Sequence, residues 1–216
     1  MFSTAIFSAC LCLVPSQVPA GAPTPSLAPS LGVTVGNSIP GPFFPYNLTG
    51  NRETSYACPI TAIEDNPCVL VFLQSGEEGS DSVKKLLTDL DNALSRYKRD
   101  NLRAFVIVVD SKIDGTIHEK DDKRNAAADK LKTWIGSLML KSLNFGLDSA
   151  AGVKLWGIPS DKAVTAVLYQ NYKVLGLHSL TTAELTDEKV GSLLGELVSK
   201  KMVQPRRNSP LPLPRP

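Results

Sequence analysis

Two short, continuous apolar runs with a helical pattern between them constrain the fold of this chain most. Residues 69–73 (VLVFL) and 103–109 (RAFVIVV) are rich in β-forming side chains, as is typical of strands buried on both faces of a sheet. Apolar residues at 83–97 recur at helical spacing, and Ser80 stands where a helix cap is expected. The pattern predicts a strand–helix–strand unit with a right-handed crossover.

The order of the following elements predicts the class of the fold. Residues 126–143 predict a second helix, after a charged loop at 110–124. Residues 164–169 (VTAVLY) and 173–177 (KVLGL) predict two strands joined by a hairpin-length connection, and such strands are antiparallel. A last helix follows, with Thr186 as its N-terminal cap. We therefore predict a single α/β domain with a mixed central sheet and helices on both faces.

The two ends of the chain differ in composition from this domain, which we place at residues 33–203. Residues 1–20 contain an apolar run at 5–14 and then small residues, which is typical of a secretory signal peptide, although no Lys or Arg precedes the run. The alternative is an apolar leader that stays attached. Residues 21–32 predict an extended linker, and residues 204–216 predict a disordered Pro-rich tail. We expect export to a periplasm, an extracellular space or a secretory lumen.

Charge and motif content argue against several classes of partner. The net charge is +2, with 23 basic and 21 acidic residues intermixed, so neither nucleic acid nor an anionic membrane is expected as the main partner. The run at 5–14 is too short to span a membrane, which takes about 20 residues, so no integral segment is expected after signal removal. Residues 110–121 begin like a calcium loop, but Lys112 stands at a ligand position. His118 and His178 have no second ligand at metal spacing, and no metal or cofactor is predicted.

Four cysteines bear on a redox role. Cys10 and Cys12 lie within the predicted signal and would be removed with it, which leaves Cys58 and Cys68. The spacing of this remaining pair matches no common zinc signature. Both a disulfide between them and two free thiols stay open.

Several segments of the domain resemble the redoxin and peroxiredoxin branch of the thioredoxin-like proteins. Residues 35–43 (VGNSIPGPF) resemble the opening of that branch, and residues 69–87 resemble the strand, active loop and first helix of thioredoxins. Residues 164–174 (VTAVLYQNYKV) resemble the penultimate strand and turn. Residues 45–50 (PYNLTG) are similar to the opening of a group of exported redoxin-like proteins. The resemblance covers roughly residues 33–202 and implies a thioredoxin-like fold.

The resemblance also implies where thiol chemistry would lie, and the sequence lacks it there. In the family, a Cys-x-x-Cys pair or a peroxidatic cysteine stands at the N-terminus of the helix after the first buried strand, where the helix dipole lowers the thiol pKa. The aligned positions here are Glu78, Gly79, Ser80 and Asp81. The place of the family's cis-proline is held by Val164. With both features absent, ordinary dithiol exchange and peroxide reduction are not expected.

Two functional hypotheses follow from this pattern. In the first, the protein is a non-catalytic binding or scaffold module, whose surface around residues 78–82 and the loop before Val164 holds a protein or peptide. In the second, it is a divergent thiol-disulfide oxidoreductase or peroxidase-like enzyme that uses Cys58 and Cys68. Cys68 begins a buried strand and is expected in the core, whereas Cys58 lies in a Pro-containing loop and is expected to be more accessible.

Overall fold

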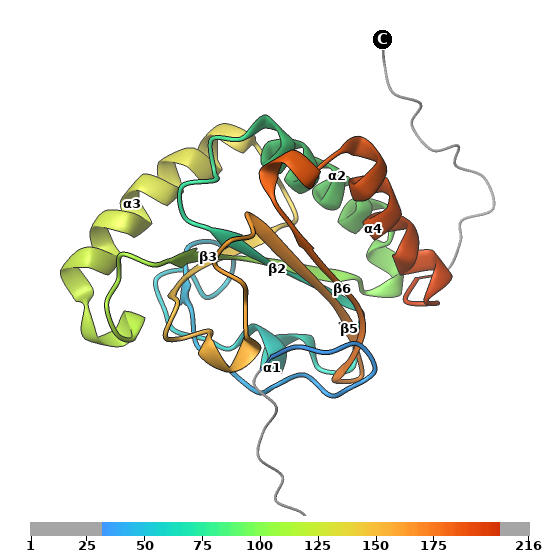
Figure 1. The fold of residues 1–216 in the computed structure, drawn as a ribbon, viewed down its shortest axis with the longest axis horizontal. Coiled ribbons are helices and arrows are strands. Elements are labelled where there is room, and N and C mark those ends of the chain that lie inside the picture. The colour runs from blue at the N-terminus through green and yellow to red at the C-terminus, as the bar shows by residue number, and fades with distance from the viewer. Residues whose placement is uncertain (1–31, 204–216) are drawn as a thin grey trace, which may run out of the picture.

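The computed structural model describes residues 32–203, which form a six-stranded mixed sheet and four α-helices (Figure 1). The predicted signal peptide, the linker up to residue 31 and the tail at 204–216 lie outside the described residues. The strands are β1 (Tyr46–Asn47), β2 (Cys68–Gln74), β3 (Arg103–Asp110), β4 (Asn144–Ser149), β5 (Val164–Gln170) and β6 (Lys173–Leu180). The helices are α1 (Pro59–Ile63), α2 (Asp81–Arg96), α3 (Asp121–Leu138) and α4 (Asp187–Ser199).

The centre of the sheet is parallel and its margins are antiparallel. The strand order is β1-β4-β3-β2-β5-β6, in which β2, β3 and β4 run parallel. β5 pairs antiparallel with β2, β6 with β5, and β1 with β4. The β5–β6 hairpin turns through Asn171 and Tyr172, which both have positive φ, as a two-residue primed turn requires. The predicted strand–helix–strand unit (β2–α2–β3) and the antiparallel hairpin are confirmed.

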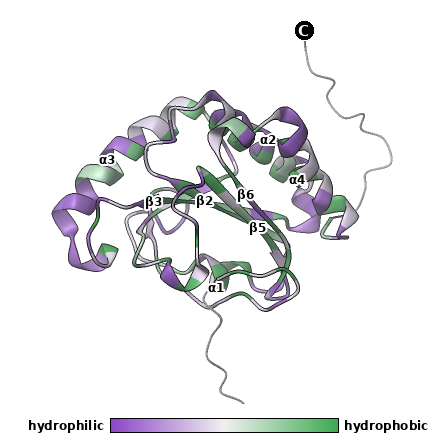
Figure 2. Ribbon diagram, in the orientation of Figure 1, coloured by the Kyte–Doolittle hydropathy of each residue, from purple (hydrophilic) through white to green (hydrophobic). Residues whose placement is uncertain are grey.

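The two faces of the sheet are covered differently. The three long helices α2, α3 and α4 pack on one face, and the short α1 packs on the other (Figure 1). Phe43, from the segment before β1, and Trp156, from a short 3-10 helix at Lys154–Trp156, complete the α1 side. In Figure 2 each long helix carries both hydrophobic and hydrophilic residues, as amphipathic surface helices do. No helix within residues 32–203 is both long and apolar enough to cross a membrane.

The stretch after the second predicted helix differs from the sequence prediction. The helix was expected at 126–143, but α3 begins at Asp121 and ends at Leu138. β4 then forms where no strand was predicted, because its sequence (NFGLDS) has only two large apolar residues, Phe145 and Leu147. Those two side chains are buried in the core, and the backbone pairs along the otherwise open edge of β3. Pairing with β3 therefore stabilises β4 as a strand, although its own apolar pattern is too short to predict one.

Both predicted helix caps occupy the expected positions, but they differ in bonding. The side chain of Thr186 accepts a hydrogen bond from the Lys189 backbone N–H at 3.3 Å, as predicted for an N-cap. Ser80 precedes α2 with an extended backbone, yet its side chain makes no capping hydrogen bond. The first turn of α2 still carries Asp81, whose negative charge is favourable at a helix N-terminus.

Candidate functional site

The carboxyl ends of the parallel strands meet at one edge of the sheet, where the thiol chemistry of redoxins is expected. The turn at 75–80 leaves β2 here, held by backbone hydrogen bonds from Glu77 N–H to Gln74 O and from Ser80 N–H to Glu77 O. The carboxylate of Glu78 folds back and accepts the Gly76 N–H at 2.7 Å. Glu78 is consequently buried, and no thiol lies in this turn.

A cavity of about 500 Å³ opens beside this turn. Its lining comes from the turn, the end of β3, the following loop and α3: Ser75, Glu78, Asp110, Lys112, Ile113, Lys123, Ala126, Ala127, Lys130 and Leu131. Two carboxylates, of Glu78 and Asp110, are buried at its base, and three exposed lysines surround them. Asp110 Oδ1 accepts the Lys112 N–H at 2.8 Å. Such a cavity provides charge and hydrogen bonds for a ligand, and none of its lining residues is a cysteine.

Val164, which holds the place of the family's cis-proline, lies at the same edge of the sheet. Val164 opens β5 and pairs with Leu73 near the end of β2, so it faces the turn at 75–80 as the resemblance implied. It is a buried core residue, and residues 32–203 contain no cis peptide bond. The Thr182 hydroxyl donates a 2.6 Å hydrogen bond to Glu77 Oε2, which ties the turn to the segment after β6. Glu78–Asp81 and Val164 are therefore brought together.

Sequence reasoning missed a third acidic group at this edge, Asp148 on β4. It pairs with Val109 of β3 and is 1% exposed. Burial raises the pKa of Asp148 to about 7, although the Ser149 N–H donates a 2.8 Å hydrogen bond to its Oδ1. Gly152 packs against this carboxyl so closely that a Cβ there would collide with it. Only recognition of β4 as a strand could have placed Asp148 in the interior.

The two cysteines lie away from this edge, and both have free thiols. Cys68 begins β2 in the core, as expected, and pairs with Tyr169 of β5. Burial raises the pKa of the Cys68 thiol, which lies beside the Tyr169 hydroxyl. Cys58 was expected to be more accessible, and this is wrong: it is 2% exposed, because it packs in the apolar layer between α1 and the sheet. Neither thiol has the exposure that a reactive thiolate needs.

These elements, with two crossovers from β2 through β3 to β4, define a thioredoxin-like α/β fold. No protein-family model and no curated protein sequence matches the chain. Three solved structures illustrate the likeness. A protein described as a thiol:disulfide interchange protein DsbE from Chlorobium tepidum has a TM-score of 0.56 and 12% identity, over 78% of this chain and 98% of that chain.

The other two structures are a thiol peroxidase and a peroxiredoxin by name. A thiol peroxidase from Chromobacterium violaceum has a TM-score of 0.51 and 15% identity, over 78% of this chain and 90% of that one. A 2-Cys peroxiredoxin from Plasmodium vivax has a TM-score of 0.50 and 15% identity, over 77% and 98%. At such identities the likeness shows the fold alone.

Proposed function

We propose that this protein is an exported thioredoxin-like module that binds a protein or peptide and performs no thiol chemistry. The observation that carries the proposal is the turn at 75–80. It follows β2, where the resemblance implies the redoxin active loop, and the buried carboxylate of Glu78 accepts a hydrogen bond within it. The burial of Cys58 and Cys68 argues against the alternative, a thiol enzyme that uses this pair.

The charges at the carboxyl edge favour a partner with acidic side chains. The rim of the cavity carries Lys112, Lys123 and Lys130, all exposed. Lys123 forms an ion pair with Asp114 at 3.0 Å, whereas no ion pair within residues 32–203 includes Lys112 or Lys130. These two ammonium groups can approach a partner carboxylate without first giving up a salt bridge.

The absence of thiol chemistry is tested with insulin-disulfide reduction and peroxide reduction, each driven by dithiothreitol. We expect wild-type protein and the Cys58→Ser/Cys68→Ser variant to show the same background rates. A wild-type rate above background that is lost in the double variant would refute the proposal and favour the oxidoreductase.

The binding role is tested by fluorescence anisotropy with two labelled peptides of equal length, one carrying three Glu and one carrying three Gln. We expect the Glu peptide to bind more tightly, and a Lys112→Glu/Lys130→Glu variant to weaken it by at least about tenfold. Lys189→Glu, on α4 and outside the cavity, makes the same kind of change elsewhere and should have little effect. Equal binding of both peptides would contradict an acidic partner.

Export is tested by intact mass of the protein recovered from a secreting host. A signal peptide at residues 1–20 should leave a mature chain that begins near Gly21. An unprocessed mass would instead favour a leader that stays attached.

A further inference from the structure

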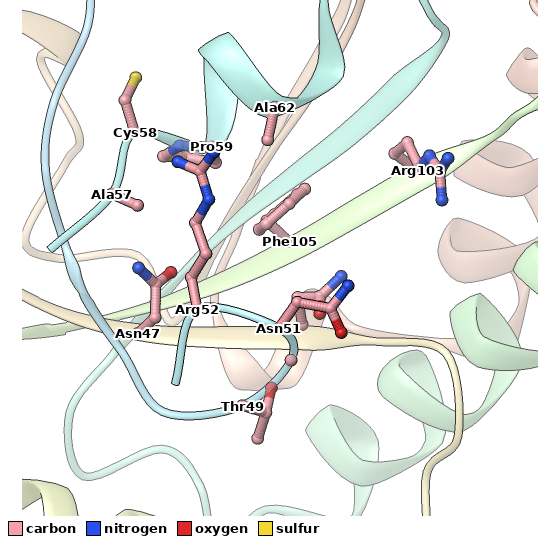
Figure 3. Close-up of a pocket in the computed structure, with 12 residues that line it drawn as sticks. Asn47, Thr49, Asn51, Arg52, Ala57, Cys58, Pro59, Ala62, Arg103 and Phe105 are labelled. Atoms are coloured by element: carbon pink, nitrogen blue, oxygen red, sulfur yellow. The ribbon is translucent and has the colours of Figure 1, made fainter. Parts of the chain in front are cut away.

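A second cavity, of about 410 Å³, lies at the opposite edge of the sheet, where β3 and β4 begin (Figure 3). It is lined by residues of the 45–52 segment, the start of α1 and the first residues of the two strands: Asn47, Thr49, Gly50, Asn51, Arg52, Ala57, Cys58, Pro59, Ala62, Arg103, Phe105 and Asn144. The volume falls in the range of small-molecule sites. The side chain of Cys58, which is one of the lining residues, points away from the other labelled side chains (Figure 3).

The PYNLTG motif at 45–50 builds one wall of this cavity. Thr49 Oγ1 accepts the Phe145 N–H at 2.8 Å, and Asn47 Nδ2 donates to Ser55 O at 2.9 Å, which fixes both side chains. Gly50 has φ +86°, and a Cβ there would collide with Oδ1 of Asn144. The wall therefore requires glycine at this position and is a defined structure instead of a loose loop.

The cavity is cationic. Arg52 and Arg103 are its only charged lining residues, and they lie on either side of Phe105 in the view of Figure 3. Neither takes part in any ion pair found among residues 32–203. An adjoining cavity of about 460 Å³ shares Arg103 with the first and adds Lys98 and Lys141, again with no carboxylate in its lining. Uncompensated positive charge around a concave site attracts anions.

The rest of the lining suits an apolar group. Phe105 is partly exposed, and Ala57, Pro59 and Ala62 add aliphatic surface to the same lining. The amides of Asn47 and Asn51 supply further hydrogen-bonding groups. We propose that this cavity binds a small organic anion, with its carboxylate or phosphate held by Arg52 and Arg103 and its apolar part resting on Phe105.

The test is isothermal titration calorimetry of the full chain with three probes: benzoate, phenyl phosphate and the neutral benzyl alcohol. We expect one or both anions to bind and benzyl alcohol to bind at least about tenfold more weakly. The comparison of benzoate with phenyl phosphate distinguishes a carboxylate ligand from a phosphate ligand. Arg52→Ala/Arg103→Ala should weaken anion binding by at least about tenfold. Lys189→Ala removes a positive charge from α4, outside both cavities, and should leave binding unchanged.

A second variant tests the cavity independently of its charge. Ala62 is an exposed residue of α1 that lines the cavity, so Ala62→Trp fills the space without replacing a core residue. We expect this variant to keep the wild-type melting temperature and to lose probe binding. The proposal is overturned if neither anion binds, if benzyl alcohol binds as tightly as the anions, or if both the double arginine variant and Ala62→Trp bind like wild type.

Discussion

At the scale of single residues, Asp148 makes the free energy of unfolding fall as pH rises, which is opposite to the effect of most carboxyl groups in folded proteins. Its pKa is raised to about 7 in the folded protein, above the ordinary value of 3.8. Between these values the folded state holds a proton that the unfolded state has released, so the free energy of unfolding falls as pH rises. We expect this carboxyl to contribute a decline on the order of 2–4 kcal/mol from pH 4 to pH 7, and little further change above about pH 8.

Asp148→Asn is the matched variant, because its amide oxygen can still accept the Ser149 N–H while the side chain stays neutral. Urea denaturation at several pH values between 4 and 8 should show a shallower decline for the variant than for wild type. Parallel curves for the two proteins would contradict a neutral, buried carboxyl.

At the scale of elements, one side chain of α2 fixes the connection from α3 to β4. Asp91 is buried, and its Oδ1 accepts the N–H groups of Lys141, Ser142 and Leu143 at 3.2, 2.7 and 3.1 Å. Asp91→Ala leaves these donors without that acceptor. We expect it to lower the free energy of unfolding by about 2–4 kcal/mol, since hydrogen bonds to charged groups are among the stronger ones.

Asp89→Ala, two residues away on the same helix, serves as the control. Asp89 forms a surface ion pair with Lys85 at 2.9 Å, and such pairs contribute less than about 1 kcal/mol. Urea denaturation of both variants should therefore show a clearly larger loss for Asp91→Ala. Equal losses would mean that the connection is held by other contacts.

Asp91 also explains why sequence patterns failed in this region. Leu143 is buried, and it lies in a connection held by Asp91, 52 positions earlier. Its apolar side chain continued the helical pattern, so the sequence predicted one long helix to residue 143. The structure instead ends α3 with Met139 in a left-handed conformation. Local periodicity predicted β2, β3 and the hairpin, whose strands carry their own apolar runs. It could not predict β4, which depends on pairing with β3.

At the scale of the whole molecule, the burial of both thiols makes them reporters of unfolding. Cys58 and Cys68 lie between the sheet and the α1 layer, at 2% and 0% exposure. In a Cys10→Ser/Cys12→Ser protein, we expect an aromatic disulfide reagent to label neither thiol under native conditions and both in denaturant. Rapid labelling of Cys58 in the native protein would show that the α1 layer opens locally, and Cys58→Ser identifies which thiol reacts.

The resemblance predicted residues 78–81 and Val164 at the carboxyl edge, and in the structure Val164 pairs with Leu73, close to the turn at 75–80. The cavities did not follow from it. Lys130 lines the cavity at the carboxyl edge only because α3 packs beside the end of β3. Arg52 and Arg103 line one cavity at the opposite edge, although 51 positions separate them in the sequence. Such groupings depend on tertiary packing, which no spacing in the sequence encodes.

A single strand connects the two cavities: β3 begins with Arg103 in one and ends with Asp110 in the other. Seven residue steps of parallel strand place their backbones about 23 Å apart. β3 is paired along its length with β2 on one side and β4 on the other, so it behaves as a stiff spacer. Occupancy of one cavity should leave the affinity of the other unchanged, and a protein holding both ligands at once would act as a fixed-length adaptor between them.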